Sequence, residues 1–397
     1  MKCKLSDICV FRKGKVDVSK LTLKTYISTE NMLPNKGGVT EASSLPTVQL
    51  TQEYKKGDIL VSNIRPYFKK IWQAKCDGGC SNDVLVFQGN SNIDGDFLYY
   101  ILANDDFFAY SMATSKGTKM PRGDKTSIMQ YEVPIFDIDT QRKIASVLRS
   151  LDEKIELNST INNNLEQQAQ AIFKEWFIDN PENNEWSTGT FSELIKSTLN
   201  GDWGKEAPTG NNTEKVYCIR GADIPEVKAG NKGKMPTRYI LPKNFAAKQL
   251  AAGDIVVEIS GGSPTQSTGR CTAITQSLLD RYDSGMVCTN FCKAMKPKEG
   301  YSLFIYYYWQ YLYGKGVFFS YENGTTGIKN LDFSGFIETE TILIPPVDKI
   351  IAFDDYCKSI FNQIFANGKQ NEHLAVLRDT LLPKLMSGEL DVSDMDL

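Results

Sequence analysis

Two long stretches of the chain carry apolar residues at alternating spacings of three and four positions. The first spans residues 141–176 and the second spans residues 349–385. Such a sustained seam is typical of coiled-coil helices, and at about 1.5 Å of rise per residue each helix would be on the order of 55 Å long. The first seam consists of Ile144, Leu148, Leu151, Ile155, Asn158, Asn162, Leu165, Ala169, Ile172 and Trp176. The second consists of Phe353, Cys357, Ile360, Ile364, Asn367, Asn371, Leu374, Arg378, Leu381 and Leu385.

The two seams are copies of one another. Every position of the second lies 209 residues after its counterpart in the first, and the two polar positions are repeated with the rest. If the helices pair antiparallel, Asn158 faces Asn371 and Asn162 faces Asn367, so polar side chains meet at the centre. Buried asparagines of this kind fix the register of a coiled coil at some cost in stability. The alternative is that each helix packs separately on its own module.

The regions before the two helices also repeat one another. Gly-Asp-Ile-Leu-Val at 57–61 returns as Gly-Asp-Ile-Val-Val at 253–257, an offset of 196 residues, and Cys-Ser-Asn at 80–82 returns as Cys-Thr-Asn at 288–290, an offset of 208. Phe-Leu-Tyr-Tyr at 97–100 resembles Phe-Ile-Tyr-Tyr at 304–307, and the Gly-Thr pair at 117–118 matches 324–325, both at an offset of 207. The change from 196 to 208 predicts an insertion of about a dozen residues in the second copy, near the Gly-Gly-Ser-Pro sequence at 261–264.

The repeated regions have the pattern of mixed modules with more strand than helix. Short apolar or alternating runs bounded by turn-forming residues predict strands at 58–63, 84–87, 255–259, 290–294 and 341–344. Aromatic-rich segments at 97–108 and 303–313 predict helices with a buried face. We therefore expect an α+β protein in which two mixed α/β modules are separated by two long helices. The helices form an antiparallel coiled coil, and the whole chain has a pseudo-two-fold internal repeat.

The length of 397 residues suits more than one core, because single cores stop growing near roughly 250–300 residues. A turn-rich sequence at 179–184 separates the two halves. The expected segments are a first module at 1–140, a central coiled-coil helix at 141–178, a second module at 179–348, a C-terminal coiled-coil helix at 349–388 and an acidic tail at 389–397.

The composition and net charge of the chain limit the classes of protein and of functional site that it can represent. Hydrophobic residues make up 41% of the chain and charged residues 23%, as in an ordinary globular protein. No apolar run approaches the roughly 18 residues of a membrane span or the core of a signal peptide, so we expect a cytoplasmic protein with reduced cysteines. The net charge of −3 means that any basic surface is local. His373 is the single histidine, which leaves almost no material for His-based metal sites or Ser-His triads.

Enzyme motifs are missing from the sequence. There is no glycine-rich loop for S-adenosylmethionine with an Asn- or Asp-Pro-Pro-aromatic motif, and no Gly-x4-Gly-Lys-Ser/Thr phosphate loop. Asp254 and Glu258 are spaced like part of a nuclease metal site, but Ser260 stands where that motif needs lysine. The cysteine pairs 76/80 and 288/292 lie in different modules, whereas structural zinc needs four close ligands. We expect no catalytic residue, no metal and no cofactor.

The order module, helix, module, helix resembles the specificity subunit of type I restriction-modification enzymes. The motifs that carry the resemblance are Gly-Asp-Ile-Leu-Val, the Gly-Thr loop, a strand ending in Val-Pro at 133–134, and Asp-x-Gln-Arg-Lys-Ile-Ala at the start of the first long helix. The resemblance covers nearly the whole chain. The second copy departs from it, because Asp-Lys-Ile-Ile-Ala at 348–352 lacks the glutamine. The contacts at the start of the second helix are therefore expected to differ.

The resemblance implies a division of labour. Each module would be a target-recognition domain that reads one half of an asymmetric bipartite site in double-stranded DNA. The helices would space the modules and dock two methyltransferase subunits, through which restriction and translocase subunits join the complex. The chain itself would be non-catalytic. The alternatives are an enzyme that acts alone, and a protein–protein adaptor or inactive relic of such a subunit.

The residues that contact DNA are sought in glycine-rich loops with cations. The loop at 115–125 contains four cations, and its counterpart at 323–330 has one lysine with several small polar side chains. An ordinary solvated turn is the alternative for both, and the aromatic residues at 306–313, which could stack bases, are at helical density more often core. The stronger candidates are Lys116, Lys119, Arg122, Lys125, Thr325, Thr326 and Lys329. The looser candidates are Arg65, Lys69, Lys70, Arg220 and Arg270.

Overall fold

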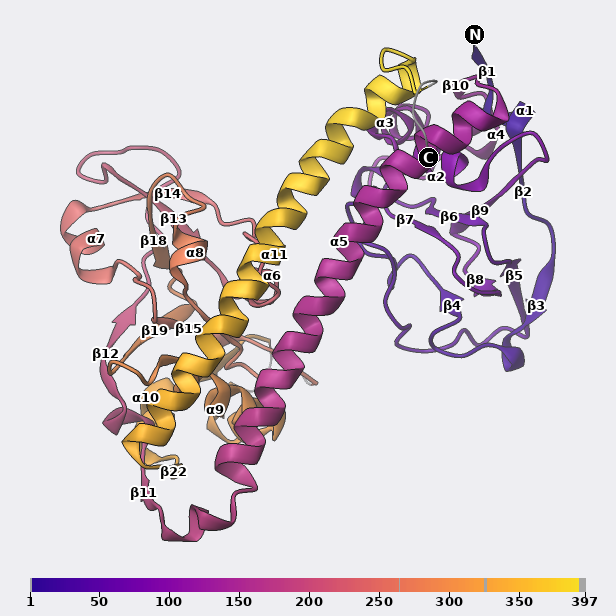
Figure 1. The fold of residues 1–397 in the computed structure, drawn as a ribbon. Helices are drawn as coiled ribbons and strands as arrows, with labels where there is room; N and C mark the ends of the chain where they lie inside the picture. The colour runs from indigo at the N-terminus through magenta and orange to yellow at the C-terminus, as the bar shows by residue number, and fades with distance from the viewer. Residues whose placement is uncertain (1, 264, 325–326, 393–397) are drawn as a thin grey trace. The chain divides into compact units, whose positions relative to one another are not determined.

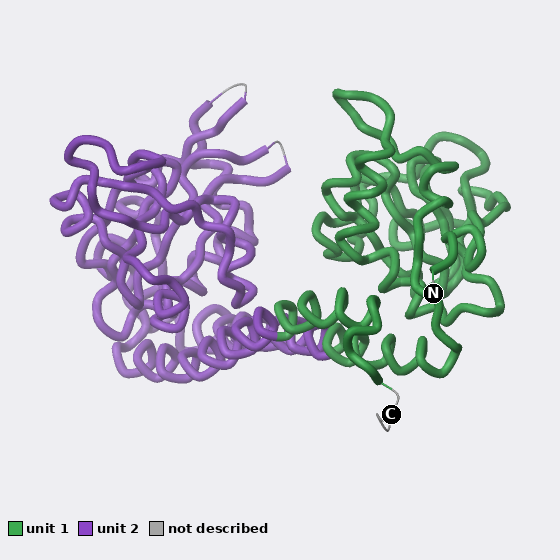
Figure 2. Tube along the Cα trace, turned by 90° about the horizontal axis from the view of Figure 1, so that it is seen from above, with its two compact units in different colours: residues 1–153, 374–397 green, residues 154–373 purple. Residues whose placement is uncertain are grey.

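The chain divides into two compact units in a computed structural model that describes residues 2–263, 265–324 and 327–392 (Figure 1). Unit 1 combines residues 1–153 with residues 374–397, and unit 2 consists of residues 154–373 (Figure 2). Both long helices, α5 (Ile138–Phe173) and α11 (Val347–Ser387), contribute residues to both units. No helix among the described residues is long and apolar enough to cross a membrane.

Unit 1 is built around two four-stranded sheets, with strand orders β2-β9-β6-β7 and β3-β5-β8-β4. Its strands are β1 (Lys2–Lys4), β2 (Cys9–Phe11), β3 (Lys15–Asp17), β4 (Tyr26–Ile27), β5 (Leu50–Tyr54), β6 (Ile59–Ser62), β7 (Ile71–Gln73), β8 (Gly78–Cys80), β9 (Val84–Gly89) and β10 (Glu132–Pro134). Its shorter helices are α1 (Leu5–Ile8), α2 (Gly95–Ala103), α3 (Asp105–Ala113) and α4 (Lys125–Ile128), with 3₁₀ turns η1 (Val18–Lys20) and η2 (Pro66–Phe68). Apolar residues of the first sheet, α2, α3 and both long helices share one core.

Unit 2 has a four-stranded sheet of order β12-β19-β15-β17 and two three-stranded sheets, β14-β13-β18 and β16-β21-β20. Its strands are β11 (Ser187–Gly189), β12 (Ile195–Asn200), β13 (Glu214–Ile219), β14 (Thr237–Ile240), β15 (Ile255–Glu258), β16 (Ser260–Gly261), β17 (Cys271–Ala273), β18 (Gly285–Cys288), β19 (Cys292–Pro297), β20 (Glu322–Asn323), β21 (Lys329–Leu331) and β22 (Ile342–Ile344). Its shorter helices are α6 (Ile224–Lys228), α7 (Pro242–Lys248), α8 (Gln276–Leu279), α9 (Ser302–Gly314) and α10 (Phe333–Thr339). Its helical turns are η3 (Lys174–Ile178), η4 (Pro181–Glu185), η5 (Phe191–Glu193), η6 (Gly221–Asp223) and η7 (Val317–Tyr321).

The strand pairings confirm the internal repeat and correct the place of its insertion. The β2-β9-β6-β7 sheet and the β12-β19-β15-β17 sheet have the same order. Ile59 of β6 pairs with Gln73 of β7, and its counterpart Ile255 of β15 pairs with Ala273 of β17, an offset of 200 residues for the second strand. Only four extra residues therefore lie near 261–264. The other eight follow β17, in the segment that contains α8, because the next repeated block has an offset of 208.

The repeated Gly-Asp pair forms the same turn in both units. The glycine has φ of +91° at 57 and +92° at 253, in the left-handed region that favours glycine. Oδ2 of Asp58 accepts a hydrogen bond from the amide of Lys55 at 2.7 Å, and Oδ2 of Asp254 accepts one from the amide of Ala251 at 2.9 Å. Both aspartates are buried, and both lead directly into a central strand. The motif is therefore a strand-leading turn.

Each of these buried aspartates also has a cationic partner. Nη2 of Arg12 lies 2.8 Å from Oδ1 of Asp58, and Nζ of Lys296 lies 2.9 Å from Oδ2 of Asp254. A buried carboxylate without a partner would be strongly destabilising. The two pairs keep the sequence motif compatible with a buried position, although the cations come from different places in the two copies.

Within unit 2 the long helices pair antiparallel through their polar seam positions. Nδ2 of Asn158 donates to Oδ1 of Asn371 at 2.8 Å, and Nδ2 of Asn367 donates to Oδ1 of Asn162 at 2.8 Å. These are the partners that the antiparallel register predicts, and all four side chains are buried. In unit 1, Ile144 of α5 and Leu385 of α11 share the core, again as that register requires. The helices are not packed separately on their own modules.

The second module packs closely on the centre of the helix pair, within unit 2. Nδ2 of Asn162 donates to the carbonyl oxygen of Ala229 at 3.1 Å, next to Gly230, whose carbonyl accepts from Nη1 of Arg281 at 2.8 Å. A Cβ atom on Gly368 of α11 would lie 1.9 Å from the carbonyl oxygen of Gly230. The two backbones therefore approach each other as only glycine permits.

The starts of the two long helices make different contacts, as the missing glutamine predicts. In unit 1 the buried Gln141 accepts a hydrogen bond through Oε1 from the amide of Asp94, at the start of α2, at 2.8 Å. In unit 2 its counterpart is Ile350. There Oδ1 of Asp354, one turn further along α11, accepts from the amide of Leu303 at the start of α9, at 2.7 Å. In both units a buried side chain of the long helix thus accepts a hydrogen bond from the start of the neighbouring helix, but it comes from a different position in the second unit.

Two expected elements differ from the structure. The helix expected at 97–108 is interrupted at Asn104, whose extended backbone (φ −65°, ψ 140°) ends α2 while its side chain caps α3 by accepting from the amide of Asp106 at 3.1 Å. The strand expected at 290–294 begins only at Cys292, because a turn closed by the amide of that residue precedes it. Asparagine is a favoured N-cap, so the first difference has a local cause.

Candidate nucleic-acid interface

In unit 1 two loops that carry candidate cations lie side by side. They are the segment 63–70, which follows β6, and the segment 115–125, which connects α3 to α4. The amide of Arg65 donates to the carbonyl of Pro121 at 2.8 Å, and Lys116 and Arg122 form an antiparallel bridge with two hydrogen bonds of 2.9 Å. The fold therefore brings together candidates that are about 50 residues apart in the sequence.

The cations of the 115–125 loop have different local partners. Nζ of Lys116 lies 2.6 Å from Oδ2 of Asp124, and this hydrogen bond, with others from Ser127, lowers the pKa of Asp124 to about 2. Nη2 of Arg122 lies 3.2 Å from Oδ1 of Asp83. Lys119 is exposed and forms no ion pair within the described part of the chain. Lys125 is also exposed and forms no ion pair among the described residues, and its Nζ lies 5.8 Å from the centroid of the Phe11 ring. Lys119 and Lys125 are thus the cations of this loop that are most available to an external anion.

The candidate lysines of the 63–70 loop take part in structural contacts. Nζ of Lys69 lies 2.7 Å from Oδ2 of Asp105, at the start of α3, and Lys36 binds the same carboxylate at 3.0 Å. Burial tends to raise the pKa of Asp105, but these two lysines outweigh it and hold the pKa below its usual value. Nζ of Lys70 donates to the carbonyl of Thr29 at 2.6 Å, and burial lowers its pKa.

Unit 2 has a corresponding pair of loops, at 259–270 and 321–331. Strands β16 and β21 join them, and Oγ of Ser260 donates to Oδ1 of Asn330 at 2.7 Å. The buried carboxylate of Glu322 ties them further, because it accepts from the amide of Thr268 at 2.6 Å and from Nζ of Lys329 at 2.7 Å. Burial tends to raise the pKa of Glu322, but these donors lower it. The candidates Thr325 and Thr326 lie outside the described residues.

The two candidate arginines of unit 2 are held by buried carboxylates. Nε and Nη2 of Arg270 each lie 2.7 Å from the oxygens of Glu258. Arg220 binds Asp223 through Nε at 2.8 Å and Nη2 at 3.0 Å, and it also donates to the carbonyl of Lys234. In this structure their guanidinium groups neutralise these acids. A role in DNA contact stays a prediction for both.

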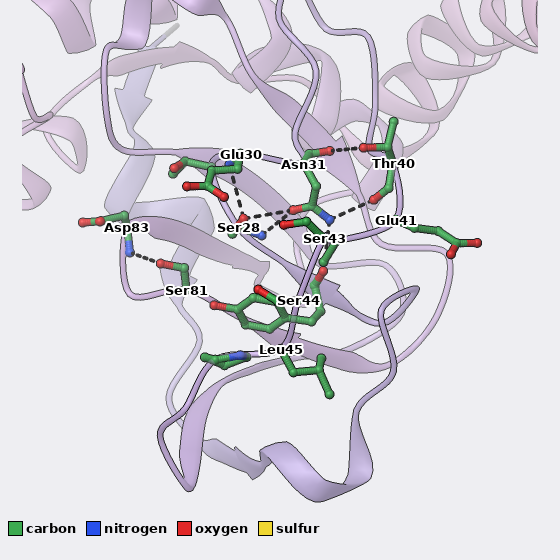
Figure 3. Close-up of a pocket in the computed structure, with 14 residues that line it drawn as sticks. Ser28, Glu30, Asn31, Thr40, Glu41, Ser43, Ser44, Leu45, Ser81 and Asp83 are labelled. Atoms are coloured by element: carbon green, nitrogen blue, oxygen red, sulfur yellow. Dashed lines mark hydrogen bonds between the residues drawn. The ribbon is translucent and has the colours of Figure 1, made fainter. Parts of the chain in front are cut away.

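Unit 1 has a polar hollow of about 410 Å³ (Figure 3). Two residues of its lining, Thr29 and Asp83, contact Lys70 and Arg122 of the candidate loops. At its centre the amide of Ser28 donates to Oδ1 of Asn31 at 2.6 Å, and Nδ2 of Asn31 donates to the carbonyl of Thr40 at 2.8 Å. Asp83, the partner of Arg122, forms part of its lining, as does Glu30. The sequence does not indicate this hollow, because residues 28–46 contain no loop rich in cations and none of the repeated blocks.

Other chemistry considered from the sequence has a structural explanation. Both thiols of the cysteine pair Cys288 and Cys292 are buried. No group of three or more potential metal ligands occurs among the residues that the structure describes. Glu258 is occupied by its arginine, and Asp254 by its lysine. Tyr306, Tyr307 and Trp309 of α9 are buried in the core of unit 2. These aromatic side chains are therefore core residues.

The exposed aromatic residues of unit 1 lie elsewhere. Tyr67 and Phe68 project from η2, between the candidates Arg65 and Lys69. The cations on both sides are candidates predicted from the sequence, whereas the two rings are not. The signal that could have identified them is an aromatic pair within a cationic, proline-containing turn, where a core position is not expected.

Known proteins match this chain over its length. Residues 1–167 match the family model described as the type I restriction modification DNA specificity domain. The specificity subunit of the type I restriction enzyme HindI from Haemophilus influenzae is 25% identical, over 97% of this chain and 98% of the relative. That of MjaIX from Methanocaldococcus jannaschii is 28% identical, over 79% of this chain and 74% of the relative.

A solved structure shares the fold. The crystal structure of a type I restriction-modification system S subunit from M. genitalium aligns with a TM-score of 0.56 at 16% identity, over 100% of this chain and 96% of that one. The fold, the internal repeat and the sequence matches agree. The chain is therefore similar to the specificity subunits of type I restriction-modification enzymes, and its residues 1–167 match the DNA specificity domain of that family.

Proposed function

We propose that this chain is the sequence-specific DNA-binding subunit of a type I restriction-modification system. The observation that carries the proposal is the duplicated pair of joined loops, 63–70 with 115–125 in unit 1 and 259–270 with 321–331 in unit 2. Loops that are joined to each other by main-chain hydrogen bonds suit the reading of base edges, because base contacts require precise placement. Each pair would read one half of a bipartite target.

The two half-sites should differ in sequence, because the residues of the two loop pairs differ. The 115–125 loop offers four cations, whereas the 323–330 segment has one lysine, which is already bound to Glu322. Phosphate contacts from cations position a protein on DNA but carry little sequence information. We assign such contacts first to Lys119 and Arg122, then to Lys116 and Lys125, and we keep Arg65, Lys69, Lys70, Lys329, Arg220, Arg270, Thr325 and Thr326 as further candidates.

The long helices would hold the two readers apart and bind partner subunits. Exposed apolar residues support docking in unit 2, where Leu157 is 53% exposed and Ile161 lies one turn further along the same helix. We propose two methyltransferase subunits as the partners, with restriction and translocase subunits joining through them. The chain would be non-catalytic, without metal or cofactor, and would work in the cytoplasm. The proposed domains keep the limits 1–140, 141–178, 179–348 and 349–388, with the tail at 389–397.

The test is co-expression with the methyltransferase subunit encoded with this chain, followed by methylome sequencing. An asymmetric bipartite motif is expected. The double variant Lys119→Glu and Arg122→Glu should abolish or strongly reduce its methylation, because charge reversal repels phosphate. Lys20→Glu, at an exposed position on η1, is the matched control and should leave the motif unchanged. Absence of any motif with the unaltered complex would favour the adaptor or relic, and full methylation by the double variant would remove the assignment of these two cations.

A further inference from the structure

Unit 1 contains a strained double turn beside its candidate loops. Among the described residues, four that are not glycine have φ between 50° and 61°, and all four lie in two adjoining turns: Asn35, Lys36, Arg65 and Lys69. Such backbone conformations persist only where the surrounding structure imposes them, and they concentrate at functional sites. The two turns are joined by their main chains, because the amide of Asn35 donates to the carbonyl of Phe68 at 2.8 Å.

Side chains fasten this double turn to the body of unit 1. Lys36 and Lys69 converge on one carboxylate, that of Asp105, at 3.0 and 2.7 Å. Pro66 fixes the backbone at the first position of η2, and the Arg65 amide ties the turn to the 115–125 loop. The turn is therefore held in one conformation at the proposed DNA interface.

What the turn presents is a pair of aromatic rings surrounded by cations. Tyr67 is 49% exposed and Phe68 is 38% exposed, with ring centroids 4.7 Å apart. Nζ of Lys70 lies 5.8 Å from the centroid of the Phe68 ring, and Arg65 precedes the pair. Aromatic rings beside cations suit a polyanion with stacked bases, because rings can stack on bases or wedge between them while cations meet the phosphates.

The described residues of the second copy have no such feature. At the corresponding place, in the 259–270 loop, left-handed positions are occupied by Gly262 and Gly269, and the sequence contains no aromatic residue between 260 and 270. The aromatic turn therefore belongs to one reader only.

We propose that Tyr67, supported by Phe68, is an aromatic wedge that unit 1 inserts at a base step of the half-site it reads. Specificity at that half-site would then include the deformability of the DNA as well as contacts with base edges. The proposal rests on the proposed function and names an element of the same interface.

The test uses the complex of the full chain with its methyltransferase subunit, and duplexes that carry the motif found by methylome sequencing. 2-Aminopurine is placed in turn at the base steps of both half-sites, since its fluorescence rises when it is unstacked. The two methylated positions are left unlabelled, because methyltransferase subunits flip the base that they modify out of the duplex. At the remaining steps, binding by the unaltered complex should raise the fluorescence at one step. Tyr67→Ala should abolish that rise and weaken binding at least tenfold, while the slope of log affinity against log salt stays unchanged because no phosphate contact is lost. Tyr67→Phe should behave like the unaltered chain.

Ile135→Ala is the matched control, because this residue of unit 1 is 48% exposed and lies outside the interface. Both alanine variants should have the thermal midpoint of the unaltered chain. If Tyr67→Ala lowers the midpoint, Tyr67→Ser replaces it in the test. Selective binding by the unaltered complex without a fluorescence rise, or a Tyr67→Ala complex that binds equally well, would overturn the wedge and leave the proposed function standing. A loss of affinity with a changed salt slope and no unstacking would also overturn it. If the unaltered complex shows no sequence-selective binding, the proposed function fails and the wedge fails with it.

Discussion

At the scale of single residues, the repeated sequence blocks identify residues with a structural role more readily than residues that contact DNA. In both copies the aspartate of the Gly-Asp pair closes a turn and forms an ion pair with an arginine or lysine, so its role is structural. Arg220 and Arg270 were selected for their charge, but they are held by Asp223 and Glu258. The partner of Arg220 is only three residues away, but the partner of Arg270 lies on β15 and that of Lys69 is 36 residues away in the sequence. Local patterns therefore identify only some of the cations that are paired.

The cysteines give a residue-scale prediction about reactivity. Burial raises the pKa of Cys80 and of Cys292 to about 12, so at pH 8 both should remain thiols and be unreactive, whereas Cys76 is exposed. Brief treatment of the native protein with iodoacetamide at pH 8, followed by peptide mass spectrometry, should find Cys76 modified and the other two protected. Prior incubation with a zinc chelator should change nothing. Labelling of Cys76 only after chelation would revive a metal site.

At the scale of elements, periodicity predicted the long helices well because a coiled coil is a local pattern repeated many times. The seam gave the antiparallel partners of Asn158 and Asn162 as well as the helices themselves. The modules were harder, since short strands owe their place to partners far away in the sequence. The insertion was misplaced because identical blocks give only total offsets, while the pairing of β7 and β17 divides the offset into two parts.

The polar centre of the helix pair should behave as a coupled unit. Asn158→Ala leaves Oδ1 of the buried Asn371 without the donor that Asn158 supplies and should lower the free energy of unfolding by about 1–3 kcal/mol. The double variant Asn158→Leu and Asn371→Leu removes both polar groups and should recover most of that loss. Urea denaturation followed by circular dichroism measures both, with Lys154→Ala as an exposed helical control. Additive losses in the double variant would contradict this coupling.

The contact between Gly230 and Gly368 gives a second element-scale prediction. Alanine is favoured over glycine in a helix by about 1 kcal/mol, yet Gly368→Ala should lower the thermal midpoint because its Cβ would collide with the Gly230 carbonyl. Gly314→Ala in α9 is the matched control, because nothing lies within 4 Å of the added methyl group. Equal midpoints for the two variants would show that the module and helix are not in close contact there.

At the scale of the whole molecule, the sequence predicted two modules and two helices but not how the chain is shared between compact units. Leu382, Leu385 and Met386 near the end of α11 are buried in the core of unit 1, together with Leu148 of α5. The pattern of seam positions shows that the helices meet, but it does not show which module core receives their ends. That depends on side chains of α2, α5 and α11 that pack together in three dimensions.

Removing residues 374–397 should therefore damage unit 1 selectively. The truncated chain loses the α11 side chains of that core, so hydrogen exchange should become fast in β6 and α2, while β15 and α9 of unit 2 remain protected. A chain shortened after Val392 is the control, because Val392 is still buried in unit 1. Equal protection of β6 in both chains would show that the N-terminal core is complete without α11.

The division of α11 between the two units also has a consequence for synthesis on the ribosome. Residues 154–373 form a continuous segment, so unit 2 can close as soon as that segment has emerged. Residues 1–153 emerge first, but their core waits for side chains made more than 220 residues later. Unit 1 is thus translated first but completes its fold last. During that interval its incomplete apolar core is the part of the nascent chain that most needs a chaperone.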